Sequence, residues 1–220
     1  MEKEHILRVL KTLRDPAQNT KRNFAQTCEL IINFKDLDIK KIENQVELFI
    51  ALQHGKGKKN KICALVGPEL ADEAKKVCDF SVEERDFDLY AKDKRKTKKL
   101  ASQYDFFIAQ ANIMSKVAGA FGRVFGPRRR MPNPKAGCVV PPKSSLEPLY
   151  NRLQDTIKVI AKERPFVQVP VGTEKLTDDQ LAENILNVYK QILHKLPGEK
   201  NNIEKVALKF TMGKPVKLES

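Results

Sequence analysis

The 220-residue chain has no tryptophan and only four cysteines. The cysteines, Cys28, Cys63, Cys78 and Cys138, are 35, 15 and 60 residues apart. Zinc sites need ligands paired at short spacing, and small secreted scaffolds need a denser set of cysteines. We therefore expect no metal site, and we interpret the cysteines as small buried apolar residues in a reducing compartment.

Long apolar runs are also missing. No stretch approaches the ~20 apolar residues that a membrane-spanning helix needs. Residues 1–14 carry charges of both signs and contain no apolar block of the kind found in secretory signals. We therefore expect a soluble, cytoplasmic protein that does not associate with membranes and is monomeric when free.

Catalytic motifs are equally scarce. Of the three histidines, His5 and His194 lie in predicted helices and His54 lies beside Gly55 in a predicted linker, where structural roles are expected. HExxH, GxSxG and P-loop motifs are absent, and no pair of carboxylates suits acid–base catalysis. We expect no enzyme activity and no cofactor.

The glycines do not form a dinucleotide-binding motif. Only Gly67 follows the first strand of the predicted parallel sheet, whereas that motif needs three glycines at GxGxxG spacing. Gly119, Gly122 and Gly126 are spaced three and four residues apart, on or after a predicted helix. This spacing favours close helix packing over a pyrophosphate site.

Acidic residues are unevenly distributed along the chain. There are 41 Lys and Arg against 28 Asp and Glu, a formal net charge of +13. Residues 106–146 contain no acidic residue and seven basic ones, which favours an anion-facing surface over a solvated face of mixed charge. A second run, Lys92–Lys99, has six basic residues and one acid. It fits a solvated helix face and an anion-binding surface equally well.

The first and last parts of the chain combine helices with strands that have one wet face. Helical spacing of apolar residues predicts helices at 2–14 and, after a Thr177–Gln180 capping box, through Ile192. Alternation predicts strands at 24–34, 45–53, 166–171 and 203–211. Residues 54–60 cannot bury themselves, so they predict a linker with a hinge at His54, Gly55 and Gly57.

The middle of the chain has a different pattern. Continuous apolar runs predict buried parallel strands at 62–66, 104–109 and 138–140. Helices are predicted at 67–78 and 112–125. A third helix opens at a Ser144–Glu147 capping box and carries Leu146, Leu149, Leu153, Ile157 and Ile160.

The predicted fold has two domains, one of the α+β class and one of the α/β class. Residues 1–60 and 156–220 form a discontinuous, RRM-like α+β domain, because each terminal part alone is too small for a domain. Residues 61–155 form a Rossmann-like α/β domain inserted into it, since strands there alternate with helices.

Two basic motifs suggest contact with a polyanion. Prolines in GPRRRMPNPKAG, residues 126–137, stiffen a loop that displays Arg128, Arg129, Arg130 and Lys135. In KFTMGKPVKL, residues 209–218, Thr211 offers a hydroxyl, and Gly213 lets another backbone approach closely. Phe24 in KRNF, residues 21–24, could stack on a base or fill the core.

These motifs resemble the ribosomal protein L-one family, the side-stalk protein of the large ribosomal subunit. GPRRRMPNPKAG is similar to the family's GPRGLMPNPKAG loop, with Arg129 and Arg130 in place of Gly-Leu. KRNF with the following Thr-x-Glu, then HGKGK at the first linker, then TMGKP near the end occur in the family's order, and KRNF and TMGKP resemble its archaeal branch.

The resemblance implies that the discontinuous domain carries the main RNA site. By motif, this site would include Phe24, Thr27, Glu29, Thr211, Met212 and Gly213, with the neighbouring Lys21, Arg22, Lys209 and Lys214. Glu29 would position its neighbours or accept a hydrogen bond from a ribose hydroxyl.

The family further implies binding to a folded helix-loop region of large-subunit ribosomal RNA. It also implies help in releasing deacylated tRNA from the exit site, and repression of translation through binding to the protein's own mRNA.

Two other functions are open on the residues alone. The Rossmann-like insert fits an enzyme that uses a nucleotide, which would show saturable binding of a mononucleotide or dinucleotide. The net charge fits a general polyanion binder, which would bind any RNA of the same length equally well.

Overall fold

The computed structural model describes residues 2–17, 19–20 and 22–218. The chain forms two compact units, which we call the split unit, Met1–Lys58 with Asp155–Ser220, and the inserted unit, Lys59–Gln154. The boundaries expected from the sequence lie within two residues of these. The expected combination of an α+β and an α/β fold is confirmed by the sheets described next.

The split unit contains a four-stranded antiparallel sheet in the order β10-β9-β1-β8 and a separate antiparallel pair, β2-β7. Its helices are α1 (Lys3–Arg14) and α7 (Asp178–Lys195). Its strands are β1 (Thr27–Phe34), β2 (Val46–Ala51), β7 (Thr156–Ala161), β8 (Phe166–Thr173), β9 (Ile203–Phe210) and β10 (Val216–Leu218).

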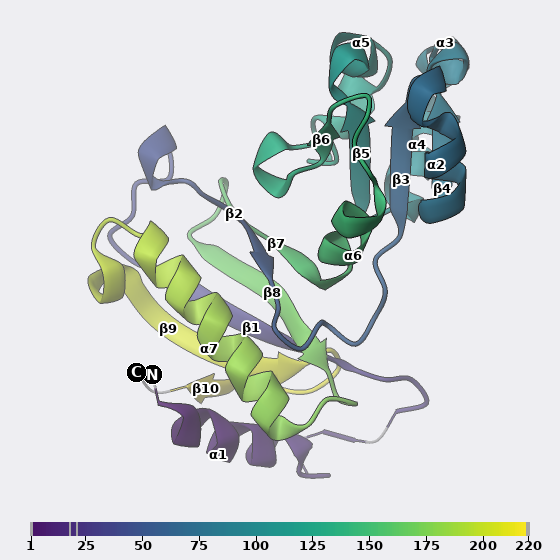
Figure 1. Ribbon diagram of the computed structural model, residues 1–220. Helices are drawn as coiled ribbons and strands as arrows, with labels where there is room; N and C mark the ends of the chain where they lie inside the picture. The colour runs from purple at the N-terminus through teal and green to yellow at the C-terminus, as the bar shows by residue number, and fades with distance from the viewer. Residues whose placement is uncertain (1, 18, 21, 219–220) are drawn as a thin grey trace. The chain divides into compact units, whose positions relative to one another are not determined.

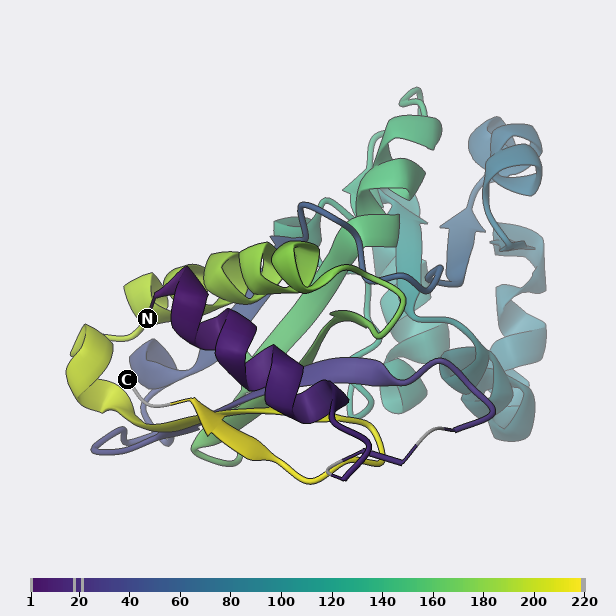
Figure 2. The same cartoon turned by 90° about the horizontal axis from the view of Figure 1, so that it is seen from below.

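One face of the four-stranded sheet is buried, and most side chains on the other face are half-buried or exposed. Every second side chain of β1, beginning with Cys28, is buried, as the alternation predicts. Helices α1 and α7 lie side by side over this buried face (Figures 1 and 2) and contribute Leu10 and Ile185 to one continuous core. The Thr177–Gln180 capping box that was predicted to open α7 is confirmed.

The inserted unit is built on a four-stranded parallel sheet in the order β4-β3-β5-β6. Its strands are β3 (Ile62–Val66), β4 (Phe80–Glu83), β5 (Phe106–Gln110) and β6 (Val139–Val140). Its helices are α2 (Ala71–Val77), α3 (Phe87–Lys92), α4 (Lys94–Gln103), α5 (Met114–Phe125) and α6 (Glu147–Asp155), the last of which ends at the boundary with the split unit.

The core of the inserted unit explains its apolar runs. Helices α3, α4 and α5 pack on one face of the sheet, where Cys63, Leu65 and Phe107 meet Phe121. The intervening residues of β3 are just as buried, because the sheet is covered on both faces. A continuous apolar strand is therefore the signature that this unit requires.

The predicted helix from Ser144 to Ile160 is wrong in its second half. Helix α6 ends at Asp155, and Ile157 belongs to β7, which pairs with β2. The β-branched residues of β7 favour a strand, although their spacing also matched a helix. The predicted capping box is wrong as well, because the Ser144 hydroxyl donates to the carbonyl of Pro141.

The prediction that the glycines of α5 allow close helix packing is also wrong. A Cβ added at Gly119 or Gly122 would meet no atom within 4 Å. Gly57 in the split unit is the opposite case, since it has φ +72° and an added Cβ would clash with Oγ1 of Thr173.

We predict opposite effects of alanine at these two positions. Gly57→Ala should lower the free energy of unfolding of the split unit by about 1–3 kcal/mol, through backbone strain and the clash with Thr173. Gly119→Ala should raise that of the inserted unit by about 0.5–1 kcal/mol, because alanine favours a helix interior. Amide hydrogen exchange of β1 and β5 measures the two units separately, and faster exchange of β5 in Gly119→Ala would contradict the assignment.

Candidate nucleic-acid interface

The end of β9 is tied to the start of β1 by three hydrogen bonds between two residues. The N–H of Thr27 donates to Oγ1 of Thr211 (3.0 Å), and the N–H of Thr211 donates to the carbonyl of Thr27 (3.0 Å). The Thr211 hydroxyl donates to the same carbonyl (3.3 Å). The expectation that this hydroxyl is offered outward is therefore wrong: it holds the turn that follows β9 in place.

That turn, residues 211–214, is fixed at a second point by Gln26. The N–H of Met212 donates to Oε1 of Gln26 (3.1 Å), whose amide nitrogen donates to Asn19 (2.9 Å). Gln26 is buried, whereas the Met212 side chain is 58% exposed. The turn is thus held on its buried side by Gln26, and its Met212 side chain points to solvent. We call residues 211–214 the Thr-Met-Gly turn.

Gly213 in the Thr-Met-Gly turn is not required by the fold. Its φ lies outside the left-handed region, and an added Cβ would meet Asn19 and Phe210 only at ordinary contact distances of 3.5–3.6 Å. A glycine at a half-buried position that tolerates a side chain leaves the backbone accessible to an external ligand.

Glu29 and Lys209 are opposite one another on β1 and β9. Both are half-buried and lie on the sheet face away from the core. The amide of Gln168 on β8 donates to the Glu29 carboxylate. Glu29 therefore holds polar neighbours on this face, which is one of the two roles expected for it.

The remaining residues expected in the site lie before β1 and at the end of the turn. Phe24 is 51% exposed. Of the two roles expected for it, stacking on a base or filling the core, the structure therefore disfavours the second. Arg22 and Lys214 are exposed, and Lys21 lies outside the described residues.

Sequence reasoning missed Gln26, Asn19 and Arg14 at this site. The Arg14 guanidinium lies 5.9 Å from the Phe210 ring centroid and donates to Asp178 (2.7 Å). Arg14 and Gln26 have partners distant in sequence, Asp178 and Met212, so no local pattern marks them.

In the inserted unit, the loop 126–137 uses two of its arginines internally. Arg128 donates to the carbonyl of Lys98 (3.2 Å) and to the Ser102 hydroxyl (2.7 Å), and Arg130 donates to the carbonyl of Asp105 (2.5 Å). Both side chains thus help to hold the loop against its own unit; Arg128 is still exposed, as expected, whereas Arg130 is half-buried.

Arg129 and Lys135 complete the loop. Arg129 has φ +55°, a left-handed conformation at the position where the resembling family has glycine. Lys135 is exposed, and its N–H donates to the side chain of Asn133, which opens a short 3-10 turn.

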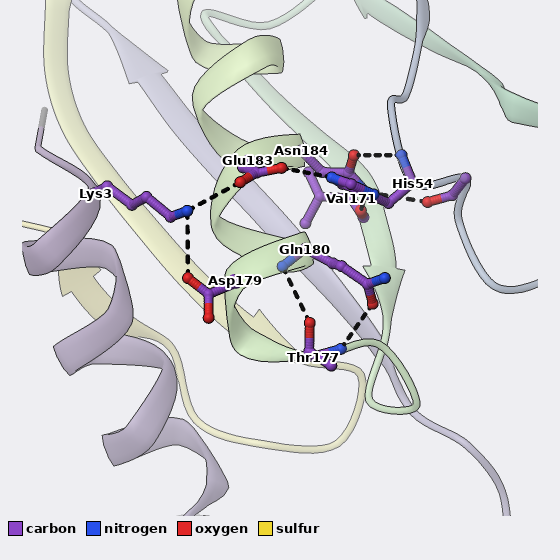
Figure 3. Close-up of polar contacts among 9 residues, drawn as sticks. Lys3, His54, Val171, Thr177, Asp179, Gln180, Glu183 and Asn184 are labelled. Atoms are coloured by element: carbon purple, nitrogen blue, oxygen red, sulfur yellow. Dashed lines mark hydrogen bonds and ion pairs between the residues drawn. The ribbon is translucent and has the colours of Figure 1, made fainter.

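The expected hinge residues are held against the split unit (Figure 3). Nε2 of His54 lies 2.6 Å from a Glu183 carboxylate oxygen, whose partner oxygen accepts from Lys3 (2.9 Å). The Asn184 side chain accepts from the N–H of His54 and donates to the carbonyl of Gly55. The Lys3 ammonium, first by its hydrogen bond, and His54 hold the pKa of Glu183 below its ordinary value.

On the other side of the boundary, Asn60 is held by the inserted unit. Its N–H and side chain donate to the side chain of Gln154 (2.8 Å) and the carbonyl of Leu153 (2.6 Å). Gln154 donates back to the Asn60 carbonyl (3.1 Å). The two chain segments that connect the units, at residues 58–59 and 154–155, are therefore both held by hydrogen bonds directly beside the boundary.

The position where an α/β sheet would bind a nucleotide is filled by side chains. The N–H of Gly67, at the end of β3, donates to Oε1 of Gln110 (2.9 Å), and Gln110 donates to Glu69 (3.0 Å). A carboxylate at the start of the helix repels a phosphate. This arrangement disfavours the nucleotide-using enzyme.

Metal-binding clusters and membrane-spanning helices are absent from the described residues. In the part of the chain that the structure describes, no group of three or more His, Cys, Asp or Glu is placed to hold a metal ion. No described helix is long and apolar enough to cross a membrane. Cys28, Cys63 and Cys138 are buried, as expected, whereas Cys78 is only half-buried. Burial raises the pKa of the Cys28 thiol to about 12.

Comparison with known proteins identifies a family. Residues 16–214 match the model of the ribosomal protein L1p/L10e family. The chain is 38% identical over 219 residues to the large ribosomal subunit protein uL1 of Pyrococcus horikoshii, which covers 99% of this chain and 97% of that protein. It is 41% identical to the Thermococcus kodakarensis protein of the same name, over 90% of each chain.

A third archaeal relative gives the same result. The large ribosomal subunit protein uL1 of Methanothermobacter thermautotrophicus is 40% identical over 198 residues, 90% of this chain and 91% of that protein. The resemblance seen in the motifs is thus confirmed over nearly the whole length. The chain belongs to the ribosomal protein L1p/L10e family, whose members are non-enzymatic, RNA-binding proteins of the large ribosomal subunit.

Proposed function

We propose that the protein binds a folded helix-loop region of large-subunit ribosomal RNA through the split unit. The contact surface is the Thr-Met-Gly turn with the adjoining open face of the sheet. The observation that carries the proposal is Gly213: the fold does not require glycine there, and a rigid backbone without a side chain at this point suits close approach by RNA.

Charge supplies affinity, and shape supplies specificity. Lysine and arginine side chains at the rim, Arg22, Lys209 and Lys214, neutralise phosphates and release counterions. The backbone of the turn and the Glu29 carboxylate offer partners for ribose hydroxyls, which distinguish RNA from DNA. Phe24 offers an exposed ring to an unpaired base.

We infer two further roles from the same surface. A site that recognises the shape of an RNA binds any transcript that reproduces that shape, so the protein's own mRNA competes for it and translation is repressed. The second role is that of the ribosome-bound protein, which assists the release of deacylated tRNA from the exit site.

Repression can be tested with a reporter mRNA that carries the protein's own leader. Translation of this reporter should fall when the protein is added and recover when excess ribosomal RNA fragment is added. Continued translation would count against repression.

We also infer where the first connection can move. His54 and Gly55 are held by α7, and Asn60 is held by the inserted unit. We therefore place the hinge at Lys58 and Lys59, which lie between these fixed residues at the boundary of the two units. The loop 126–137 is a secondary basic surface in this proposal, through Arg129 and the exposed Lys135.

Gly213→Ala tests the contact without disturbing the fold. The added methyl group has room within the protein, so the unfolding temperature should not change. Overpacking against RNA should weaken binding to a side-stalk ribosomal RNA transcript by about 1–3 kcal/mol. Unchanged affinity, measured by filter binding at fixed salt, would remove the turn from the interface.

Thr211→Val tests the hydrogen bonds that hold the turn. Valine leaves the N–H of Thr27 without its Oγ1 acceptor, so RNA binding should weaken by about 1–3 kcal/mol. Thr211→Ser keeps the hydroxyl and should bind nearly as well as the parent protein. If both variants bind alike, the hydroxyl has no part in positioning the turn.

The salt dependence measures the phosphate contacts. If about six phosphates are neutralised, log K should fall against log salt with a slope of about −4, or roughly two to three decades for a fourfold rise in salt. Lys209→Ala with Lys214→Ala should make the slope shallower by about 1.4. The control, Lys35→Ala with Lys200→Ala, removes exposed lysines near the other end of β1 and should not change the slope. Equal slopes in both double variants would contradict the placement of the site.

A further inference from the structure

The inserted unit has a small hollow that the proposed interface does not use. Its volume is about 220 Å³. It is lined by Phe80 at the start of β4, Tyr90 of α3, four residues of α4, which are Lys96, Lys99, Leu100 and Gln103, and Tyr104. We call it the aromatic hollow.

Phe80 is an exposed aromatic ring that is already stacked on one side. Its ring lies 5.8 Å from that of Tyr104 with an interplanar angle of 20°. Tyr104 is half-buried and packs in turn against Phe107 (6.3 Å, edge-on). Phe80 itself is 40% exposed. A large apolar ring held rigidly at the surface suits stacking by another flat group.

Lys96 and Lys99 give the hollow a positive charge. They are three residues apart on α4, so they project from the same side of the helix as the buried Leu100. In the described part of the chain, neither ammonium group forms an ion pair. The acid of this basic run, Asp93, caps α4, and hydrogen bonds from the backbone of Lys96 and Arg95 lower its pKa.

A larger hollow in the same unit lacks this property. It has a volume of about 740 Å³, but its cations are neutralised: Lys116 is paired with Glu84, and Arg85 with Glu83 (3.0 Å). The aromatic hollow therefore combines two features that the larger one lacks, a stacking surface and unpaired cations.

We propose that the aromatic hollow binds an unpaired nucleotide of single-stranded RNA. The base stacks on Phe80, and the flanking phosphates contact Lys96 and Lys99. Stacking on an aromatic ring beside a basic groove is the general mode of single-strand binding, and bases within a duplex are not available for it. For the basic run Lys92–Lys99, the proposal favours anion binding over a solvated face.

The absence of tryptophan allows a direct test in the full-length protein. Phe80→Trp places the sole tryptophan of the chain at the hollow, and an octamer of uridylate is the probe. The fluorescence of this tryptophan should be quenched in a saturable manner by the octamer and not by duplex RNA at the same nucleotide concentration. Leu89→Trp is the matched control, at a 60% exposed position on α3 outside the hollow lining, and should show no saturable quenching.

Three further variants in the Phe80→Trp protein complete the test. Lys96→Glu with Lys99→Glu should raise the dissociation constant from the quenching curve about tenfold or more, whereas Lys98→Glu with Lys143→Glu, exposed lysines outside the hollow, should have a smaller effect. Thr211→Val should leave the quenching unchanged, which separates this site from that of the split unit. The proposal is overturned by absent quenching, by equal quenching of Leu89→Trp or by duplex RNA, or by indifference to reversal of Lys96 and Lys99.

Discussion

The split unit depends on the pairing of β1 with strands from the other end of the chain. β1 lies between β8 and β9, so residues 27–34 gain both of their strand neighbours from beyond residue 155. The hydrogen bonds between Thr27 and Thr211 close this pairing at the end where the Thr-Met-Gly turn emerges. Because the turn is fixed by the same contacts that join the two segments, its backbone can meet a ligand with little loss of conformational entropy. The fold and the proposed interface thus share one set of contacts.

The sequence predicted elements whose signals are local. Alternation in Cys28, Leu30 and Ile32 identified β1, and the continuous run 62–66 identified a strand covered on both faces. The prediction was wrong where the same residues fit both a helical and a strand pattern, as at Ile157 and Ile160. There, pairing with β2 makes the segment a strand. Short elements such as β4 and β10 gave too little pattern to be found. The main candidate residues came from motif resemblance. The roles of Gln26 and the Thr211 hydroxyl could not be inferred, since their partners Met212 and Thr27 are remote in sequence.

Net charge alone does not locate binding surfaces in this protein. Several of its cations are used internally: Arg128 and Arg130 hold a loop, Arg14 holds the start of α7, and Lys3 holds Glu183. The cations that lie beside the Thr-Met-Gly turn or beside the surface ring of Phe80 are the ones to which we assign the main RNA contacts. This distinction separates the Thr-Met-Gly turn and the aromatic hollow from the larger, internally neutralised hollow of the inserted unit.

The central claim is that a rigid turn of the split unit recognises the shape of one folded RNA, while phosphate contacts supply affinity for any RNA. The most direct measurement is a salt titration of the full-length protein against a side-stalk ribosomal RNA fragment and a scrambled RNA of equal length. Phosphate contacts respond to salt and shape contacts do not, so the account predicts two roughly parallel lines of log K against log salt, with the fragment bound more tightly throughout. Superimposed lines would show a general polyanion binder and would contradict the account.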